Sequence, residues 1–523
     1  MKPPCTEAAI QFKPAAAPCA KGAEPWILAV TILGSSMAFI DSTVVNVALP
    51  ALQANLGGTV VDLQWVVEAY ALFMSALLLT GGSLGDLFGR RKMFLFGVIL
   101  FTAASVACGV APDIRILVLA RAVQGVGAAF LVPGSLSIIS ASFGEKDRGR
   151  AIGTWSGFTA ITAAVGPVLG GWLIDHASWR WAFFINVPTA VVVIGLALWR
   201  VPESTAEGMK KVDWIGAFLV TVGLGALTFG LIEAPNLGWS SPAVWGTIGI
   251  GIISLFGFLA VEARSSFPLI PLELFRSWDF SGANWITLFL YAALGIFLFL
   301  FPLDLIQVQH YSATATGAAA LPLILLMFLL SRWSGGLITR YGPRLPLMVG
   351  PGIAAVGFAL FAVPGVGGNY WTSFFPAFLV LGFGMAVSVA PLTTVVMGAV
   401  DQNRAGTASG INNTVARVAG LLAVAIVGMA ILAAFRSRLE PNLQTLTLSA
   451  EAMQALQANE DKLAALAAPA GVDSATAVAI QMFVARAFVF GFRTMMLLCA
   501  GLSIASALFA WWMIGAGRDK KAG

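Results

Sequence analysis

Long apolar stretches recur along the whole chain, and they constrain its fold more than any other feature. Crossing the hydrocarbon core of a bilayer takes about 20 residues of helix. Fourteen stretches approach or exceed that length; they lie at 26–50, 62–82, 93–111, 114–140, 151–174, 181–199, 214–234, 243–261, 280–306, 316–338, 346–365, 371–399, 407–435 and 488–514. Because lipid offers the backbone no hydrogen-bond partners, each is expected to be a helix. The sequence predicts an all-α polytopic membrane protein.

The composition agrees with this reading and excludes several other classes. Of the 523 residues, 58% are hydrophobic and only 11% are charged, which is too little charge for a soluble protein. The four cysteines and two histidines form no metal-binding cluster, so neither a metal nor a disulfide framework is expected. No Ser/His/Asp arrangement and no Walker A motif is present, which argues against an enzyme or an ATP-driven pump. No cofactor is expected.

The basic residues orient the chain. With the N-terminus in the cytoplasm, 20 of the 30 Lys and Arg residues fall in cytoplasmic segments, and the short outside loops hold only Arg115 and Arg180. This bias follows the positive-inside rule and predicts that both termini are cytoplasmic, with tails at 1–25 and 515–523. The first span has no cleavage site after it and is expected to be retained. Topology thus accounts for the net charge of +5, and nucleic-acid binding has no support.

A short repeat suggests two halves. "GSLGDLFGRR" (82–91) and "GGLITRYGPR" (335–344) share Gly, Leu, Gly and Arg at the same offsets. Each follows the second span of a six-span block, as in transporters built from parallel repeats. We therefore expect six-helix bundles at 26–199 and 280–514, joined by a linker at 200–279 that holds two extra helices. Segment 436–487 is expected to be a long outside excursion, to which the sequence assigns no function.

Several motifs recur in a known order. The loop after the second span, "GGSLGDLFGRRK", is built on Gly82, Asp86, Gly89, Arg90 and Arg91. The fourth span contains "LVLARAVQGVGAA", with Arg121, Gln124 and Gly125. The fifth contains "GFTAITAAVGPVLGG", with Gly157, Gly166, Pro167, Gly170 and Gly171. Together with "DSTVVNVALP" and "WRWAFFINVP", these motifs resemble the major facilitator superfamily and, within it, the fourteen-helix drug:proton antiporters of multidrug efflux.

The resemblance implies a major facilitator fold, monomeric, with two helices inserted between its bundles. It also implies that the loop of the second and third spans is a conformational latch, in which Asp86 pairs with Arg90 or Arg91; a plain topology anchor is the alternative. The glycines and Pro167 of the fifth span would form a gating interface, or else ordinary tight packing. In the second repeat Thr339 replaces the acid, so no role is assigned to it.

Among the ionisable residues inside predicted spans, four are candidates for proton or substrate coupling: Asp41, Glu68, Arg121 and Asp304. Intramembrane charges usually face a bundle interior or a water cavity, because lipid contact is costly. Arg121 is also the residue for which the resemblance implies proton relay. The alternatives are a static ion pair or strut and, for Asp304, a helix-end position in headgroup water.

Polar residues at helical spacing mark a candidate substrate cavity. Asn284, Thr287 and Tyr291 share a face of the ninth span, and the thirteenth span carries Asn412, Asn413 and Arg417. Their place within apolar stretches suggests contact with a cavity.

The leading hypothesis is a secondary transporter of the cell (inner) membrane that exports amphipathic cations in exchange for protons. A cation can compete with a proton for the same carboxylate, which favours cationic substrates. Export or symport of a specific metabolite, coupled to protons on the same fold, stays open. In a host with an outer membrane an adaptor protein would receive the substrate, although the sequence indicates no docking surface.

Overall fold

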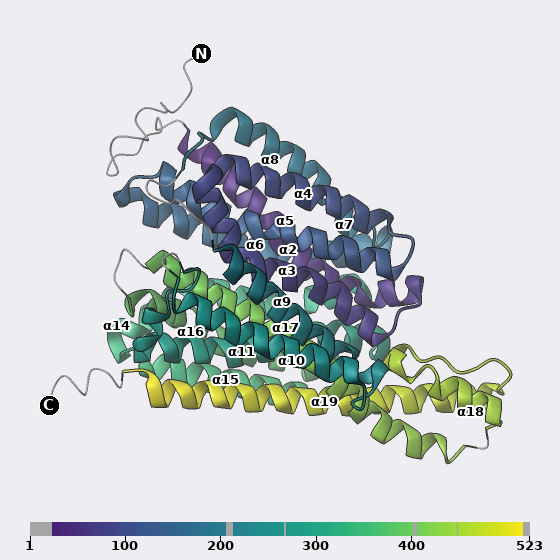
Figure 1. The fold of residues 1–523 in the computed structure, drawn as a ribbon. Helices are drawn as coiled ribbons and strands as arrows, with labels where there is room; N and C mark the ends of the chain where they lie inside the picture. Colours follow the sequence, from purple (N-terminus) through teal and green to yellow (C-terminus); the bar gives the residue numbers. More distant parts are fainter. Residues whose placement is uncertain (1–22, 206–212, 266–267, 401–404, 447, 516–523) are drawn as a thin grey trace. The chain divides into compact units, whose positions relative to one another are not determined.

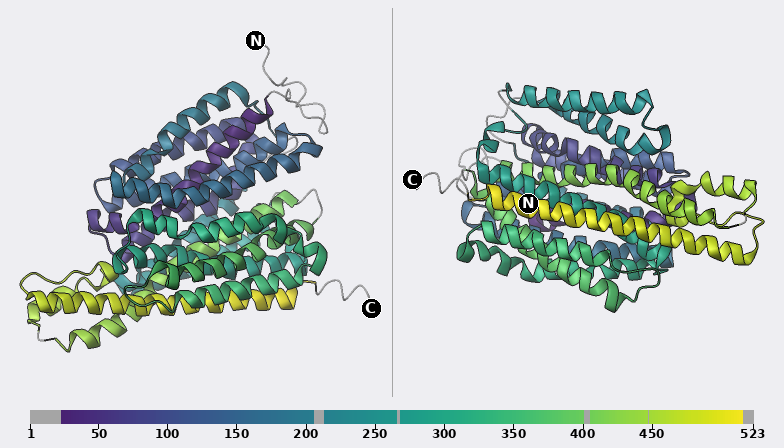
Figure 2. Two further views of the ribbon diagram at one scale, coloured as in Figure 1. Left: turned by 180° about the vertical axis from the view of Figure 1, so that it is seen from behind. Right: turned by 90° about the horizontal axis from the view of Figure 1, so that it is seen from below.

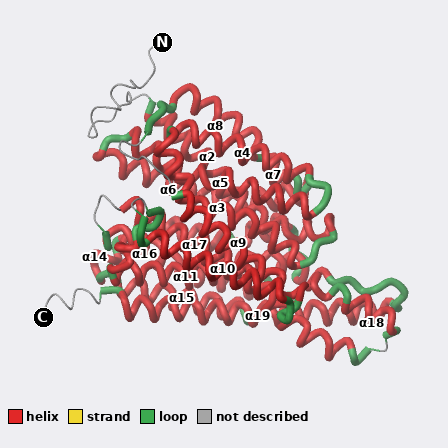
Figure 3. Tube along the Cα trace, in the orientation of Figure 1, coloured by secondary structure: helices red, strands yellow, loops and turns green. Residues whose placement is uncertain are grey.

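The computed structural model describes the chain except for residues 1–22, 206–212, 266–267, 401–404, 447 and 516–523. All regular secondary structure in the described ranges is helical (Figure 3). This agrees with the expectation that apolar spans satisfy their backbone groups internally.

Thirteen helical stretches of the described chain are long and apolar enough to cross a membrane. They are α2 (Glu24–Leu56), α3 (Val60–Phe88), α4 (Arg90–Val110), α5 (Ile114–Ser142), α7–α8 (Trp181–Phe184, Asn186–Arg200), α9 (Trp214–Leu237), α10 (Pro242–Glu262), α11 with η2 (Trp278–Leu303, Asp304–Val308), α12–α13 (Ala313–Ala319, Leu321–Gly335), α15 (Arg344–Phe361), η3 with α16 (Tyr370–Phe374, Phe375–Gly398), α17 (Ala405–Leu443) and α19 (Ser474–Met513). A further helix, α6 (Glu145–His176), covers the predicted fifth span. Each of the fourteen predicted spans therefore corresponds to a helix.

Proline explains where two of these spans are interrupted. The sixth breaks at Ile185, between α7 and α8, and Pro188 cannot donate a hydrogen bond to the carbonyl of Phe184. The tenth breaks at Ala320, between α12 and α13, where Pro322 occupies the first turn of the second piece.

The predicted bounds of the last two spans were wrong. α17 continues eight residues past 435, and α19 begins fourteen residues before 488, so the irregular part of segment 436–487 is confined to about 444–473. That part holds α18 (Ala450–Gln457) and η5 (Glu460–Ala465), which lie beside one end of α19 (Figure 2). Buried Leu456 and Leu463 and the 3.0 Å ion pair of Arg436 with Glu460 hold the excursion together. Packing thus extends both helices beyond the apolar stretch that predicted them.

Contacts divide the chain into two compact units. The first comprises Met1–Val45, Ala69–Leu227 and Gly249–Pro271, and the second comprises Asn46–Glu68, Thr228–Ile248 and Leu272–Gly523. In the first, α4 packs against α5 and α8 around a core that includes Phe94 and Phe101. In the second, α15 lies between α16 and α19, and α11 packs against α17 and α19 (Figure 1). The bundles at 26–199 and 280–514 stay a prediction from the repeat.

Residues 46–68, which comprise the end of α2, the connection and the start of α3, are anchored within the second unit by glutamine side chains. Gln53 donates to the carbonyl of Lys462 (3.2 Å) and accepts from the Nε2 of Gln307 (2.8 Å). Gln64, fully buried, donates from its Nε2 to the carbonyl of Val424 on α17 (2.5 Å). A Cβ at Gly428 would lie 2.1 Å from the Oε1 of Gln64. A glycine is therefore required where this side chain meets α17.

Gly428→Ala should destabilise the protein by about 1–3 kcal/mol, because an added methyl overpacks a filled site. Thermal unfolding of the detergent-solubilised protein measures the loss. Gly420→Ala is the matched control, since a Cβ at Gly420 meets nothing within 4 Å in the described structure. Adding Gln64→Ala to Gly428→Ala should restore part of the lost stability, because it removes the side chain that the new methyl meets. Equal thermal midpoints for Gly428→Ala and Gly420→Ala would contradict the close contact of Gln64 with Gly428.

Candidate functional site

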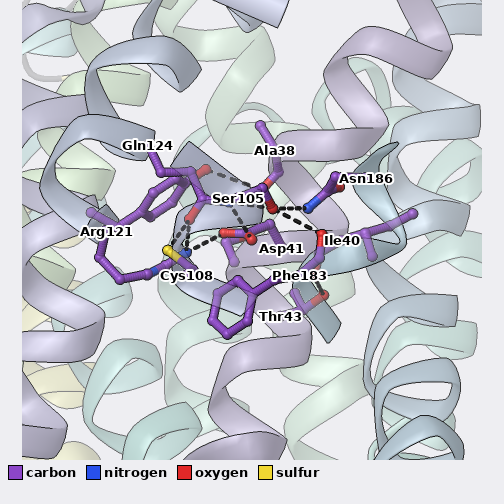
Figure 4. A network of polar contacts seen from close by, with 12 residues as sticks. Ala38, Ile40, Asp41, Thr43, Ser105, Cys108, Arg121, Gln124, Phe183 and Asn186 are labelled. Carbon is purple, nitrogen blue, oxygen red and sulfur yellow. Dashed lines mark hydrogen bonds and ion pairs between the residues drawn. The ribbon is translucent and has the colours of Figure 1, made fainter. Parts of the chain in front are cut away.

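A buried ion pair lies at the centre of the first unit. Asp41 on α2 accepts a hydrogen bond from the Nη1 of Arg121 on α5, at 2.5 Å (Figure 4). Asp41 is 0% and Arg121 1% exposed, so neither charge is solvated by bulk water. Asp41 lies fifteen residues before the end of α2, about 22 Å along the helix, which is deeper than an end at residue 50 predicted.

Neutral polar groups complete the coordination of this pair. Gln124, one turn after Arg121, donates from its Nε2 to the Oδ1 of Asp41 (2.8 Å), and its Oε1 accepts from Arg121 (2.8 Å). The same Nε2 contacts the hydroxyl of Ser105 on α4 (3.2 Å). Asn186 on α8 donates to Ser105 (2.9 Å), and Ser105 donates to the carbonyl of Phe183 (2.9 Å). Four helices thus converge on the two charges.

Aromatic rings cover the guanidinium of Arg121. Its Cζ lies 4.2 Å from the centroid of the Tyr70 ring and 5.9 Å from that of Phe183. The Tyr70 hydroxyl donates to the carbonyl of Ala38 (3.3 Å), which fixes this ring beside α2. Ring faces attract a cation, and they also exclude water from it. The two charges are thereby enclosed by protein groups, and each compensates the charge of the other.

This arrangement has a definite chemical consequence. The Asp41 carboxylate can accept a proton, and once neutral it no longer compensates the charge of Arg121. Removing one partner of a buried pair costs about 3–5 kcal/mol, because the other charge is left uncompensated. Any change that removes the charge of Asp41 would therefore leave the charge of Arg121 uncompensated within the protein.

The fifth-span motif packs α6 against α2 next to Asp41. A Cβ at Gly166 would lie 2.1 Å from the Oγ1 of Thr43, and one at Gly170 would lie 2.6 Å from Val44. These two glycines therefore permit a close approach of the helices. Gly171 is buried as well, whereas a Cβ at Gly157 would meet nothing within 4 Å among the described atoms.

Two other predicted acids, Glu68 on α3 and Asp304 in η2, belong to the second unit. They are 1% and 2% exposed, so the helix-end position of Asp304 in η2 does not bring its side chain to the surface of the structure. Gln309 approaches the Oδ2 of Asp304 at 3.5 Å, and its Oδ1 has no hydrogen-bond partner in the described chain. The same holds for the Oε2 of Glu68. Neither acid forms an ion pair within the described ranges.

The second unit also brings together part of the predicted cavity. Asn412 on α17 donates to Asn284 (3.2 Å) and to Thr287 (2.6 Å), both on α11. Asn413 instead donates to the carbonyl of Ser409 in its own helix and is exposed. Tyr291 and Arg417 lie further along the same two helices and are partly buried.

The loop between α3 and α4 contains the ion pair that the sequence suggested. Arg90 donates from its Nε to Asp86 at 2.7 Å, and Gly89 has φ +114°, a conformation that favours glycine. Glu203, which sequence reasoning missed, accepts from the backbone N–H groups of Arg91 and Lys92 and thereby caps α4. A Cβ at Gly82 would meet Pro133 at 3.4 Å, which is an ordinary contact, so packing does not by itself require a glycine there.

The corresponding loop of the second repeat keeps the turn but not the charge pair. Gly342 has φ +73°, so both repeats use a glycine with positive φ at the matching position. Thr339 donates to the carbonyl of Gly336 in its own turn.

Comparison with known proteins agrees with these features. Residues 31–424 match the sequence profile of the Major Facilitator Superfamily. The chain belongs to this superfamily. It is 36% identical over 426 residues to multidrug resistance protein Stp of Mycobacterium tuberculosis, which covers 80% of this chain and 78% of that protein. It is 31% identical over 411 residues to the tetracenomycin C resistance and export protein of Streptomyces glaucescens, which covers 77% and 76%.

Solved structures show the same fold at low sequence identity. A bacterial homologue of the human lysosomal transporter Spinster matches with a TM-score of 0.68 and 18% identity over 94% of this chain and 97% of that one. The POT family transporter PepTSo matches with a TM-score of 0.63 and 15% identity over 97% of this chain and 99% of that one. The predicted family and the all-α major facilitator fold are therefore confirmed. The protein is a multi-pass transporter of a drug-efflux family, not an enzyme.

Sequence reasoning missed several groups of the buried network. Gln124 was recognised only as part of a motif, and Ser105, Cys108 and Asn186 were not considered. Cys108 contacts the Oε1 of Gln124 at 3.6 Å. The available signal was a polar side chain within an apolar span, which Asn186 in "AFFINVP" provides. Within the described ranges no three His, Cys, Asp or Glu side chains gather closely enough to hold a metal ion.

A double-mutant cycle should show that the two charges depend on each other. Arg121→Gln and Asp41→Asn should each lower the thermal midpoint, the first corresponding to about 3–5 kcal/mol, because each leaves one buried charge uncompensated. The double variant, which carries no charge at this site, should be more stable than Arg121→Gln alone. Strictly additive losses would contradict the energetic coupling.

Proposed function

We propose that the protein exports amphipathic cations in exchange for protons, by alternating access across the cell membrane. The observation that carries this proposal is the buried ion pair of Asp41 with Arg121. The carboxylate is the member of this pair that can gain a proton, since a guanidinium stays protonated. Asp41 is therefore the group that would bind the driving proton.

The size of the coupling supports a switching role. Moving a two-state equilibrium from 1:99 to 99:1 requires about 5.5 kcal/mol of differential free energy. Loss of the charge on Asp41 supplies about 3–5 kcal/mol of this through the uncompensated Arg121. A rearrangement that solvates Arg121, or gives it another partner, would recover that energy. Protonation and conformational change would then be linked.

The remaining acids support a cationic substrate. A carboxylate buried without a cationic partner is costly when charged, and neither Glu68 nor Asp304 forms an ion pair within the described ranges. A substrate cation that enters beside such a group would displace its proton and supply the missing counter-charge. An anionic substrate would have no such advantage.

Orientation and direction complete the proposal. The excess of basic residues in alternate loops supports an orientation with both termini in the cytoplasm. The names of the relatives, which include a resistance and export protein, favour outward transport of a toxic compound. The Asp86–Arg90 pair would act as the latch of the cytoplasmic side, formed in one state and broken in the other.

Transport in inside-out vesicles tests this function. With an imposed pH gradient, lipophilic cations should dissipate the gradient for the native chain, and Asp41→Asn should reduce that dissipation at least tenfold. Fluorescence of a pH-sensitive dye reports the gradient in each case.

Asp113→Asn is the matched control, because it removes a carboxylate that caps α5 in the exposed loop and asparagine caps equally well. It should transport as the native chain does. If no cation in a broad panel affects the gradient with the native chain, the cation-export function is wrong; if Asp41→Asn transports normally, the assigned proton site is wrong.

A further inference from the structure

The contact between α11 and α17 contains a hydrogen-bond network whose orientation can be worked out from its ends. Asn284 donates from its Nδ2 to the carbonyl of Phe280 (2.9 Å), and Thr287 donates to the carbonyl of Ala283 (2.9 Å). Backbone carbonyls only accept, so they fix which end of the Asn284 amide faces them. The Oδ1 of Asn284 therefore points away from its own backbone.

This orientation fixes the amide of Asn412 as well. Its Nδ2 lies 3.2 Å from the Oδ1 of Asn284 and 2.6 Å from the hydroxyl oxygen of Thr287, whose hydrogen is already donated. Reversing the amide would place its oxygen against two other oxygens. Because only an N–H group satisfies both contacts, the oxygen of Asn412 must lie on the side away from α11.

The oxygen of Asn412 is left without a donor among the described residues. Asn284 and Thr287 are 5% and 0% exposed, whereas Asn412 is partly exposed, so the network is closed on the α11 side and a ligand or water would reach it at Asn412. Asn412 lies seven residues into α17, roughly 10 Å from its start and inside a membrane-spanning stretch. A hydrogen-bond acceptor without a partner at such depth costs free energy unless water or a ligand donates a hydrogen bond to it.

We propose that the Oδ1 of Asn412 is a specificity-determining acceptor that selects substrates carrying an N–H donor, such as protonated amines, over quaternary ammonium compounds. The proposal rests on the function proposed above and names the substrate class more narrowly. A charge-assisted N–H bond to a carbonyl is stronger than a neutral one. A quaternary nitrogen has no hydrogen to donate, so it would gain only the charge interaction.

A matched pair of substrates tests this directly. A lipophilic tertiary amine and its N-methyl quaternary derivative share one scaffold and one charge, and they differ in a single donor. The native chain should transport the amine with about tenfold higher efficiency than the quaternary compound, which is the value of one hydrogen bond to a charged group. Asn412→Leu should bring the ratio close to one.

Each variant is judged by the ratio of its transport rates for the amine and the quaternary compound. This ratio does not depend on how much folded protein each preparation contains. Asn413→Leu is the matched control, because Asn413 is the next residue and bonds only within its own helix; it should keep the native ratio. If Asn412→Leu proves unstable, Asn412→Ala removes the same acceptor with a smaller side chain and should likewise bring the ratio close to one.

The outcomes separate this inference from the function on which it rests. Equal transport of both compounds by the native chain, or an unchanged preference in Asn412→Leu, overturns the role of Asn412 and leaves cation export standing. Transport of neither compound by the native chain overturns cation export as well.

Discussion

The salt bridge of Asp41 with Arg121, shielded from water, is the interaction on which the first unit is built. Two charges without bulk water are tolerable only if every lone pair and N–H group near them is occupied. Gln124 on α5 meets part of that requirement by bonding to both charged side chains, and side chains from α4 and α8 support it in turn. The glycines of α6 let that helix approach α2 beside the acid. The packing of five helices thus follows from the placement of one carboxylate.

The polar groups of the two units differ in kind, and this difference suggests that the units have different functions. The first unit holds a compensated charge pair, whose energy depends strongly on protonation. The second holds acids without a cationic partner in the described chain, together with a neutral amide network at Asn412. A charge pair is suited to sensing a proton, while a directional acceptor is suited to distinguishing one organic cation from another. Energy coupling and substrate selection would then lie on different parts of the sequence.

Most of the fold could be predicted because a bilayer leaves few alternatives: fourteen apolar stretches became fourteen helices. The predictions that failed concerned helix ends, which are governed by packing rather than by hydropathy. α17 and α19 extend beyond their apolar stretches because they gain contacts with η5 and with each other. The candidate acids were visible as isolated charges in apolar surroundings. Their partners were not, since Ser105 and Asn186 are ordinary polar residues until the fold brings them within 3 Å of each other.

Proton release on substrate binding is the most direct test of whether Asp41 takes part in the exchange of protons for cations. A lipophilic cation is added to the detergent-solubilised protein in a weakly buffered solution near neutral pH, and the protons released are counted per cation bound. The account predicts that binding to the native chain releases protons and that Asp41→Asn, with cation binding still measurable, releases fewer. Equal release from both proteins would show that Asp41 takes no part in the exchange, and it would contradict the account.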